Sequence, residues 1–158
     1  MVVKHITIQP ATLVLRIGPF GFHRYGREFF EAAVALKKGR SFSPVRYYLY
    51  CHAIELLLKA FLLTEGMAVA TLRNKPYSHD LERILKKARS SGLHKIVTIT
   101  PARETEIKRA NSYYNSKGFE YFKVGPMAEG YLSLPDLSVL RRFASRLVQV
   151  LEPICLHY

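Results

Sequence analysis

Apolar residues recur every three or four positions along most of this chain, which is the spacing of amphipathic α-helices. Ser43 before Pro44 and Thr100 before Pro101 each place a capping side chain ahead of a proline at the first helical position. These signals predict helices from near Tyr25 to Gly39, Ser43 to Gly66, Ser78 to Gly92, Thr100 to Gly118 and Pro135 to Pro153. The pattern predicts an all-α fold, an antiparallel bundle of four to five helices.

The remaining segments lack this helical spacing. Residues 5–17 alternate around Pro10, which predicts an extended arm or two short strands, followed by a turn at Gly18 to Gly21. Residues 67–77 are expected to form a loop. We therefore expect a short extended N-terminal arm over residues 1–24 and one helical bundle over residues 25–158.

The segment Cys51 to Leu63 is apolar on nearly all sides and predicts a helix in the core. At 100° per residue, Tyr48, His52, Glu55 and Lys59 fall in one narrow arc of this helix. Charges in apolar surroundings cost several kcal/mol unless they are paired or still touch water. We expect this polar stripe to face a partner, a cleft or a dimer seam.

Composition narrows the class of protein. With 158 residues, 49% of them hydrophobic, the chain can bury a single core. It shows neither an unbroken apolar span nor a signal-peptide core, so we expect a cytoplasmic protein that does not bind membranes. Cys51 and Cys155 lack metal-ligand spacing and are expected to be reduced core thiols, the alternative being a disulfide.

The charge balance points to polyanions. The chain has 24 Lys and Arg against 12 Asp and Glu, a net charge of +12, which favours binding to phosphate backbones. The basic residues are spread over several predicted helices instead of forming one compact patch. Nucleic acid is therefore the first partner to consider, while solvated helix faces remain the alternative.

Three segments carry a resemblance to a known family: HAIELLLKAFLLTEG (52–66), YSHDLERILKKA (77–88) and ANSYYNSKGFEY (110–121). An apolar helix that ends in glycine is followed, a dozen residues later, by His-Asp-Leu at the start of another helix. In this order the segments resemble the HEPN (higher eukaryote and prokaryote nucleotide-binding) domain over about residues 28–151. The resemblance implies an all-α bundle, frequent homodimers, and roles in RNA cleavage, toxin–antitoxin or defence systems, or nucleotide binding.

Ribonuclease members of that family carry Arg, usually followed by a polar residue, and then His after four to six intervening positions. Here Arg73 is followed by Asn74, and His79 comes after five intervening residues. An imidazole titrates near neutrality and can move a proton at the 2′-OH or 5′-oxygen of RNA without metal, while arginine stabilises the phosphoryl charge. This motif lies before the third helix, earlier than is usual in the family. The alternative is structural, with His79 and Asp80 at a helix N-terminus bonding the backbone or Glu55.

Other candidates allow two readings each. Glu55 and Lys59 are spaced for a helical ion pair, or Glu55 orients the imidazole of His79 or His52. If the chain is catalytic, Glu55 or Asp80 would orient His79. Tyr113, Tyr114, Phe119, Tyr121 and Phe122, interleaved with Lys117 and Lys123, either stack unpaired bases or plug the end of the bundle.

The sequence thus predicts a protein that binds RNA or nucleotide. The alternatives are a metal-independent ribonuclease using Arg73 and His79, and a non-catalytic adaptor or dimerisation module. Candidate catalytic residues are Arg73, His79, Glu55 and Asp80, and candidate binding residues are His52, Lys59, Asn74, Tyr113, Lys117 and Tyr121. We expect no metal and no cofactor, a homodimer, and an antitoxin or nucleotidyltransferase as a protein partner.

Overall fold

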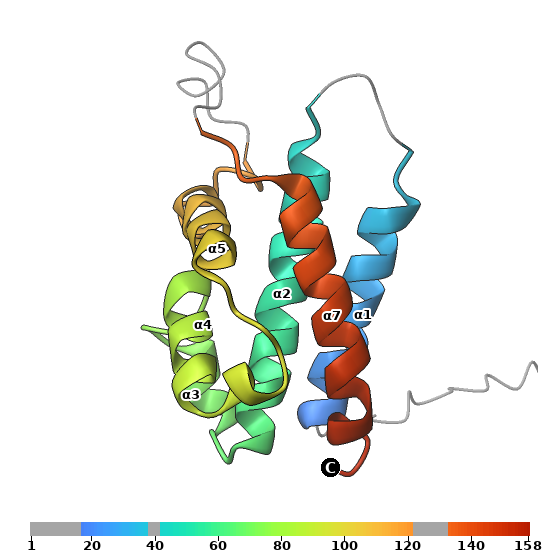
Figure 1. The fold of residues 1–158 in the computed structure, drawn as a ribbon, viewed down its shortest axis with the longest axis vertical. Helices are drawn as coiled ribbons and strands as arrows, with labels where there is room; N and C mark the ends of the chain where they lie inside the picture. Colours follow the sequence, from blue (N-terminus) through green and yellow to red (C-terminus); the bar gives the residue numbers. More distant parts are fainter. Residues whose placement is uncertain (1–16, 38–41, 122–132) are drawn as a thin grey trace, which may run out of the picture.

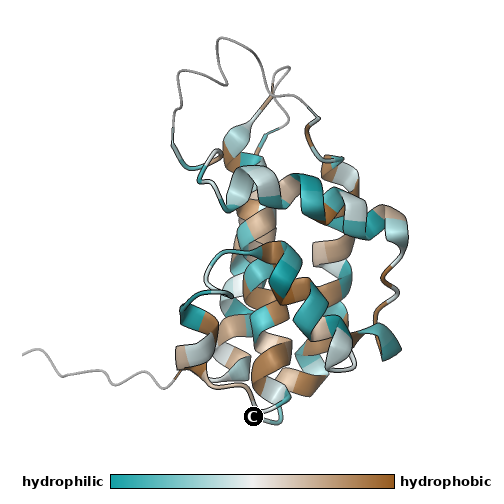
Figure 2. Ribbon diagram, turned by 90° about the vertical axis from the view of Figure 1, so that its left-hand side faces the viewer, coloured by the Kyte–Doolittle hydropathy of each residue, from teal (hydrophilic) through white to brown (hydrophobic). Residues whose placement is uncertain are grey.

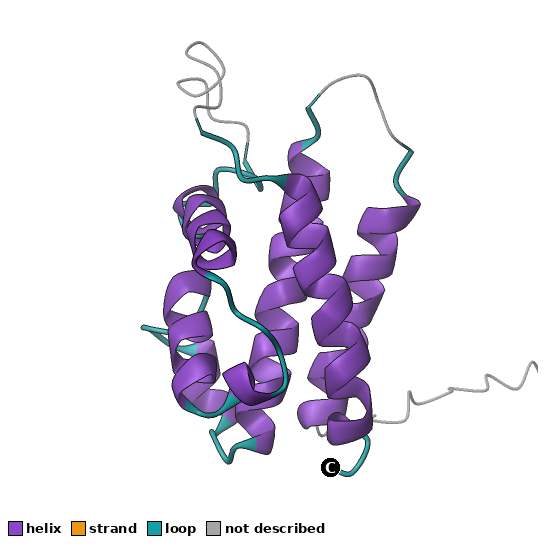
Figure 3. Ribbon diagram, in the orientation of Figure 1, coloured by secondary structure: helices purple, strands orange, loops and turns teal. Residues whose placement is uncertain are grey.

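The computed structural model describes residues 17–37, 42–121 and 133–158, and this part of the chain is helical (Figures 1 and 3). Its α-helices are α1 (Pro19–Ala35), α2 (Pro44–Thr64), α3 (Val69–Arg73), α4 (Leu81–Ser90), α5 (Pro101–Tyr114) and α7 (Leu137–Cys155), with a 3₁₀ turn η1 (Leu93–Lys95) after α4. The described residues contain no strand. The predicted all-α class is confirmed for this part, and residues 1–16 of the predicted arm lie outside it.

Helix α2 forms the centre of the fold. It contacts α1 and α7 on one side and α4 and α5 on the other, as Figure 1 shows. Between Tyr50 and Leu62 all of its residues except His52 and Leu56 are buried. The side formed by α4 and α5 faces the viewer in Figure 2 and carries hydrophilic residues on its outer surfaces. The predicted core helix is therefore confirmed, since an all-round apolar helix needs neighbours on several sides.

Helix α1 approaches α2 closely because Gly26 has no side chain. A Cβ at this position would lie 2.8 Å from Cγ of Leu57 and 3.2 Å from the carbonyl oxygen of Ala53. Nε2 of the buried His23 lies 2.9 Å from the carbonyl oxygen of Val148 and thus links α1 to α7. These contacts close one side of the bundle without using the polar stripe of α2.

Two predicted helix starts are confirmed and two are corrected. Ser43 and Thr100 cap α2 and α5 as expected, each accepting a backbone N–H three residues later. Helix α1 begins at Pro19 and not near Tyr25, so residues 19–24 are helical, with Pro19 pre-set for the first turn. Asp80, and not Ser78, caps α4 by accepting the N–H of Arg83 at 3.0 Å.

The structure also differs from the prediction in one loop and in the ends of α5 and α7. Residues 69–73 form the short helix α3 within the expected loop. Helix α5 ends at Tyr114 instead of Gly118. Helix α7 runs from Leu137 to Cys155 and includes Pro153.

Both cysteines are buried free thiols, as expected. Burial raises the pKa of the Cys155 thiol to about 11 and that of Cys51 further, so neither is a reactive thiolate at neutral pH. Among the described residues, every helix is too short or too polar to cross a bilayer.

Candidate functional site

The polar stripe of α2 faces the start of α4 and the end of α5. Glu55 is 2% exposed and Lys59 is 5% exposed, although both side chains carry charge. The stripe is covered by segments of the same chain, at the turn before α4 and at Tyr114. The expectation that it faces a partner or a dimer seam is therefore wrong for Glu55 and Lys59.

Glu55 is the centre of this polar cluster. Nζ of Lys59 lies 2.5 Å from its Oε1, and Nζ also donates to the carbonyl oxygen of Ser78 at 2.7 Å. The Tyr114 hydroxyl donates to Oε2 of Glu55, and Nδ1 of His79 lies 3.2 Å from the same oxygen. The prediction that the stripe and His79 lie together is confirmed, and the Glu55–Lys59 pair is buried instead of exposed.

His52 completes the cluster through Tyr114. Its Nδ1 lies 2.7 Å from the Tyr114 hydroxyl oxygen and 3.7 Å from Oε2 of Glu55. Because the hydroxyl donates its proton to Glu55, its oxygen accepts from His52, which places a proton on Nδ1. The ring also stacks on Tyr48 with centroids 5.5 Å apart. His52 therefore supports Tyr114.

The environment shifts the pKa values of these groups in opposite directions. Burial raises the pKa of Glu55, but favourable interactions with His52, His79 and Lys59 outweigh it and hold that pKa below its usual range. The hydrogen bond to Glu55 raises the pKa of His79 above its ordinary value. Burial, followed by the charge of Glu55, raises the pKa of Tyr114. Glu55 is therefore the anion of the cluster, and Tyr114 stays a neutral donor.

His79 is the member of the cluster that reaches solvent. Its side chain is 50% exposed, and Glu55 engages its Nδ1. The other ring nitrogen, Nε2, is then available to a ligand. The raised pKa increases the imidazolium fraction at neutral pH, so Nε2 can donate to an anionic oxygen.

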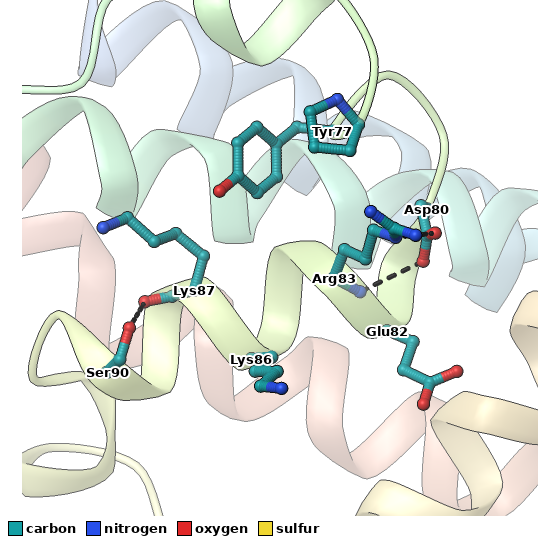
Figure 4. A pocket seen from close by; sticks show the side chains of 8 residues that line it. Tyr77, Asp80, Glu82, Arg83, Lys86, Lys87 and Ser90 are labelled. Atoms are coloured by element: carbon teal, nitrogen blue, oxygen red, sulfur yellow. Dashed lines mark hydrogen bonds and ion pairs between the residues drawn. The ribbon is translucent and has the colours of Figure 1, made fainter.

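Two hollows on the surface are lined in part by chain neighbours of His79. One of about 230 Å³ is lined by Lys75, Pro76, Ser78, Asp80, Arg83 and Asn115. A second of about 670 Å³ shares three of these residues and extends along α4 past Lys86 and Lys87, with Glu82 also in its wall (Figure 4). Lys75 and Arg83 thus bring positive charge to a hollow whose wall includes Ser78 and Asp80, the chain neighbours of His79, while Arg83 is also paired with Asp80.

Asp80 does not orient His79. Its Oδ1 accepts the N–H of Arg83 and, at 3.0 Å, the side-chain amide of Asn111, while Oδ2 lies 3.1 Å from Nε of Arg83. Asn111 in turn accepts the buried N–H of Leu81 at 2.8 Å. The alternative role of Asp80 as a helix cap therefore describes its contacts, and its expected role in orienting the imidazole is corrected.

Arg73 and Asn74 are outside the cluster. Arg73 is exposed at the end of α3 and forms no hydrogen bond or ion pair with the described residues. The Asn74 side chain donates to the carbonyl oxygen of Ala70 at 2.9 Å and so ends that helix. The literal spacing of the Arg73/His79 motif does not bring the two side chains into contact here.

The aromatic segment divides into a packed part and an exposed part. The rings of Tyr113 and Phe119 stack with centroids 5.2 Å apart, and Phe119 stacks on Tyr47 at 5.3 Å. Only Tyr121 is largely exposed, with Nζ of Lys117 5.6 Å from its ring centroid. Most of these rings close the end of the bundle, and Phe122 and Lys123 lie outside the described residues.

The sequence reasoning missed two residues of the site as such. The sequence places Tyr114 only among the aromatic side chains that stack bases or plug the bundle, and it predicts no role for Asn111. In the structure the Tyr114 hydroxyl donates to Glu55 on α2, and the Asn111 side chain accepts the N–H of Leu81 on α4. The signal that could have identified them is that Asn111 and Tyr114 carry polar groups and share the buried face of α5 with Ile107 and Ala110. In the described part of the chain no His, Cys, Asp and Glu side chains group as metal ligands.

Comparison with protein-family models, with curated proteins and with solved structures gave no match for this chain. The geometry of the Glu55 cluster therefore has to support any functional assignment.

Proposed function

We propose that the chain is an RNA-binding protein of HEPN type in which His79 contacts a phosphate. The observation that supports this most is the half-exposed imidazole held on the buried carboxylate of Glu55. Its chain neighbours Ser78 and Asp80 line a hollow that Lys75 and Arg83 also line. A cationic imidazole and neighbouring ammonium and guanidinium groups are donors that bind phosphate oxygens. The net charge of +12 adds a sequence-independent attraction to the same ligand.

Binding to a fluorescein-labelled single-stranded RNA of about 20 nucleotides, followed by anisotropy, tests this proposal. The logarithm of affinity should fall linearly with the logarithm of salt concentration. His79→Gln should weaken binding more at pH 6 than at pH 8.5, because only the imidazolium donates from Nε2 to phosphate. Lys75→Gln should weaken binding at both pH values.

His94→Gln is the matched control. His94 is also exposed, but its Nδ1 lies 2.8 Å from the carbonyl oxygen of Arg89, away from the Glu55 cluster. It should leave affinity unchanged. Absence of binding at low salt, or equal effects of His79→Gln and His94→Gln, would refute the proposed site and favour an adaptor.

A second candidate function is metal-independent RNA cleavage. The Glu55–His79 contact favours it, because a carboxylate that engages Nδ1 leaves Nε2 to accept the 2′-OH proton when the ring is neutral. The 2′-oxygen would attack the adjacent phosphorus to form a 2′,3′-cyclic phosphate, and the 5′-oxygen would leave and take a proton from water. Incubation of the same RNA with the parent protein in the presence of a chelator should then yield RNA fragments, and these should be absent with Arg73→Ala and with His79→Ala. If the RNA stays intact with the parent protein, the cleavage hypothesis is rejected. The homodimer and an antitoxin or nucleotidyltransferase partner stay predictions.

A further inference from the structure

The outer face of α7 carries arginines without partners. Arg141, Arg142 and Arg146 are exposed and form no hydrogen bond or ion pair with the described residues. Five arginines of other helices pair with carboxylates instead: Arg24 with Glu28, Arg27 with Glu152, Arg83 with Asp80, Arg89 with Glu104 and Arg109 with Glu106. Paired arginines have their donors occupied by a carboxylate, whereas the α7 arginines keep their forks free.

These arginines share a hollow of about 490 Å³. Its wall consists of Ser138, Arg141, Arg142, Ser145, Arg146 and Gln149, which we call the arginine face. All six side chains can donate hydrogen bonds, and none is acidic or apolar. By contrast, the hollow along α4 contains Asp80 and Glu82 as well as basic residues. The arginine face is therefore the more strongly cationic of the two surfaces.

The surroundings of this face contain one further cation and one carboxylate. The guanidinium of Arg103 on α5 lies over the Phe143 ring of α7, 4.9 Å from its centroid. Burial, followed by the charge of Arg142, lowers the pKa of Arg103, which indicates that these two cations are neighbours. The carboxylate of Asp136, at the start of α7, accepts the N–H of Ser138 at 2.7 Å as the helix cap. The hydrogen bonds from Ser138 and the charge of Arg142 lower the pKa of Asp136, so this carboxylate offsets part of the charge at one end of the face.

We propose that the arginine face of α7 binds the phosphodiester backbone of RNA, at a second site separate from His79. Arginine forks match phosphate oxygens in a bidentate manner, and serine and glutamine side chains also contact phosphates. Protein interfaces generally bury apolar side chains at their centre, which the wall of this hollow lacks, and stable membrane binding generally adds buried apolar area to electrostatic attraction. The proposal rests on the proposed RNA binding and adds a second contact surface, since the wall of this hollow shares no residue with the hollows near His79.

The test compares two triple variants of the full chain that lose the same charge. Arg141→Gln, Arg142→Gln and Arg146→Gln together remove the arginine face. The control combines Arg24→Gln, Arg89→Gln and Arg109→Gln, whose arginines pair with glutamates. Binding to the labelled single-stranded RNA should weaken at least about tenfold in the first variant, and its salt slope should fall by about 2 to 3. The control should lose less than about threefold, because its arginines keep carboxylates engaged.

Each outcome separates the two proposals. Equal weakening in the two triple variants would show a net-charge effect and overturn the second site. Unchanged binding in the α7 variant together with loss in Lys75→Gln and His79→Gln would overturn the second site and leave the proposed function standing. The reverse pattern would support the arginine face and refute the His79 site. Cosedimentation of the parent, but not of the α7 variant, with phosphatidylserine vesicles, combined with unchanged RNA binding, would assign the face to a membrane and overturn the proposal.

Discussion

The cluster around Glu55 and the arginine face of α7 both concentrate charge, but they handle it in opposite ways. In the cluster, Glu55 and Lys59 are buried, and each charged atom has a partner within the chain. On α7, the three arginines are exposed and lack carboxylate partners among the described residues. Buried charge must be compensated inside the fold, whereas exposed charge is compensated by water or by a ligand.

This difference separates structural charge from charge available for binding. Lys59 cannot reach a ligand, because Glu55 and the Ser78 carbonyl hold its ammonium group under α4. His79 lies between the two extremes, with one ring nitrogen on Glu55 and its side chain half exposed. His79 and the exposed basic side chains therefore keep donor groups that a ligand can reach.

The largest expected effect comes from neutralising the buried carboxylate. Glu55→Gln keeps the shape but leaves Lys59 as a buried cation without a counter-ion, so stability should fall by about 3–5 kcal/mol in urea unfolding. The double variant Glu55→Gln with Lys59→Met should be less destabilised than the single one, since both charges are gone. Glu104→Gln, which removes a surface pair with Arg89, should cost less than about 1 kcal/mol. A loss as small for Glu55→Gln would mean that the cluster is open to water.

Asn111→Ala should have the next largest effect. The change leaves the buried N–H of Leu81 without an acceptor and removes a donor from Asp80, which should cost about 1–3 kcal/mol. Asn115→Ala is the matched control, because Asn115 is exposed at the end of α5 and its loss should stay within about 0.5 kcal/mol. Equal losses in the two variants would show that Asn111 is not needed at the start of α4.

Much of the fold could be predicted from the sequence because the strongest signals are local. The all-round apolar character of α2 gave its central position, and the caps at Ser43 and Thr100 gave two helix starts. The cap of α4 could not be chosen between Ser78 and Asp80, because the choice depends on Asn111, which is distant in sequence. Pro19 was read as part of a turn, although proline also suits the first turn of a helix.

The candidate site was predictable only in part. The helical arc that joins His52, Glu55 and Lys59 is a property of one helix, and the short connection to α4 brings His79 back to it. The contact of Tyr114 with Glu55 could not be predicted, because its hydroxyl reaches Glu55 only when α5 is rotated about its axis as it is in this fold. Whether the α7 arginines have ion-pair partners also depends on which carboxylates the fold brings near them. The spacing of residues along the sequence does not reveal this.

The titration of His79 should change stability less than the two substitutions above. It tests the residue that lies between the buried Glu55 cluster and the surface. Its pKa is raised by Glu55, so it should exceed the ordinary value of about 6.5 when followed by NMR. Because the folded-state pKa is the higher one, this contribution to stability is complete below about pH 6.5 and is lost as the pH rises through the folded-state pKa. Tyr114→Phe removes a competing donor from Oε2 of Glu55 and should raise the pKa of His79 further. A value at or below about 6.5 would contradict the contact with Glu55.

The smallest effect is expected on α7, and its sign should be opposite to that of Glu55→Gln. Arg142 and Arg146 are one helical turn apart, and like charges at this spacing destabilise a helix by about 0.2–0.5 kcal/mol. Arg146→Gln should therefore raise the free energy of unfolding by about this amount at low salt, and added salt should abolish the gain by screening the repulsion. Arg109→Gln, which breaks the surface pair with Glu106, should give a small loss instead. If Arg146→Gln lowered stability by more than about 1 kcal/mol, Arg146 would have a structural partner in the fold, and the contrast between buried, compensated charge and free surface charge would fail at this helix.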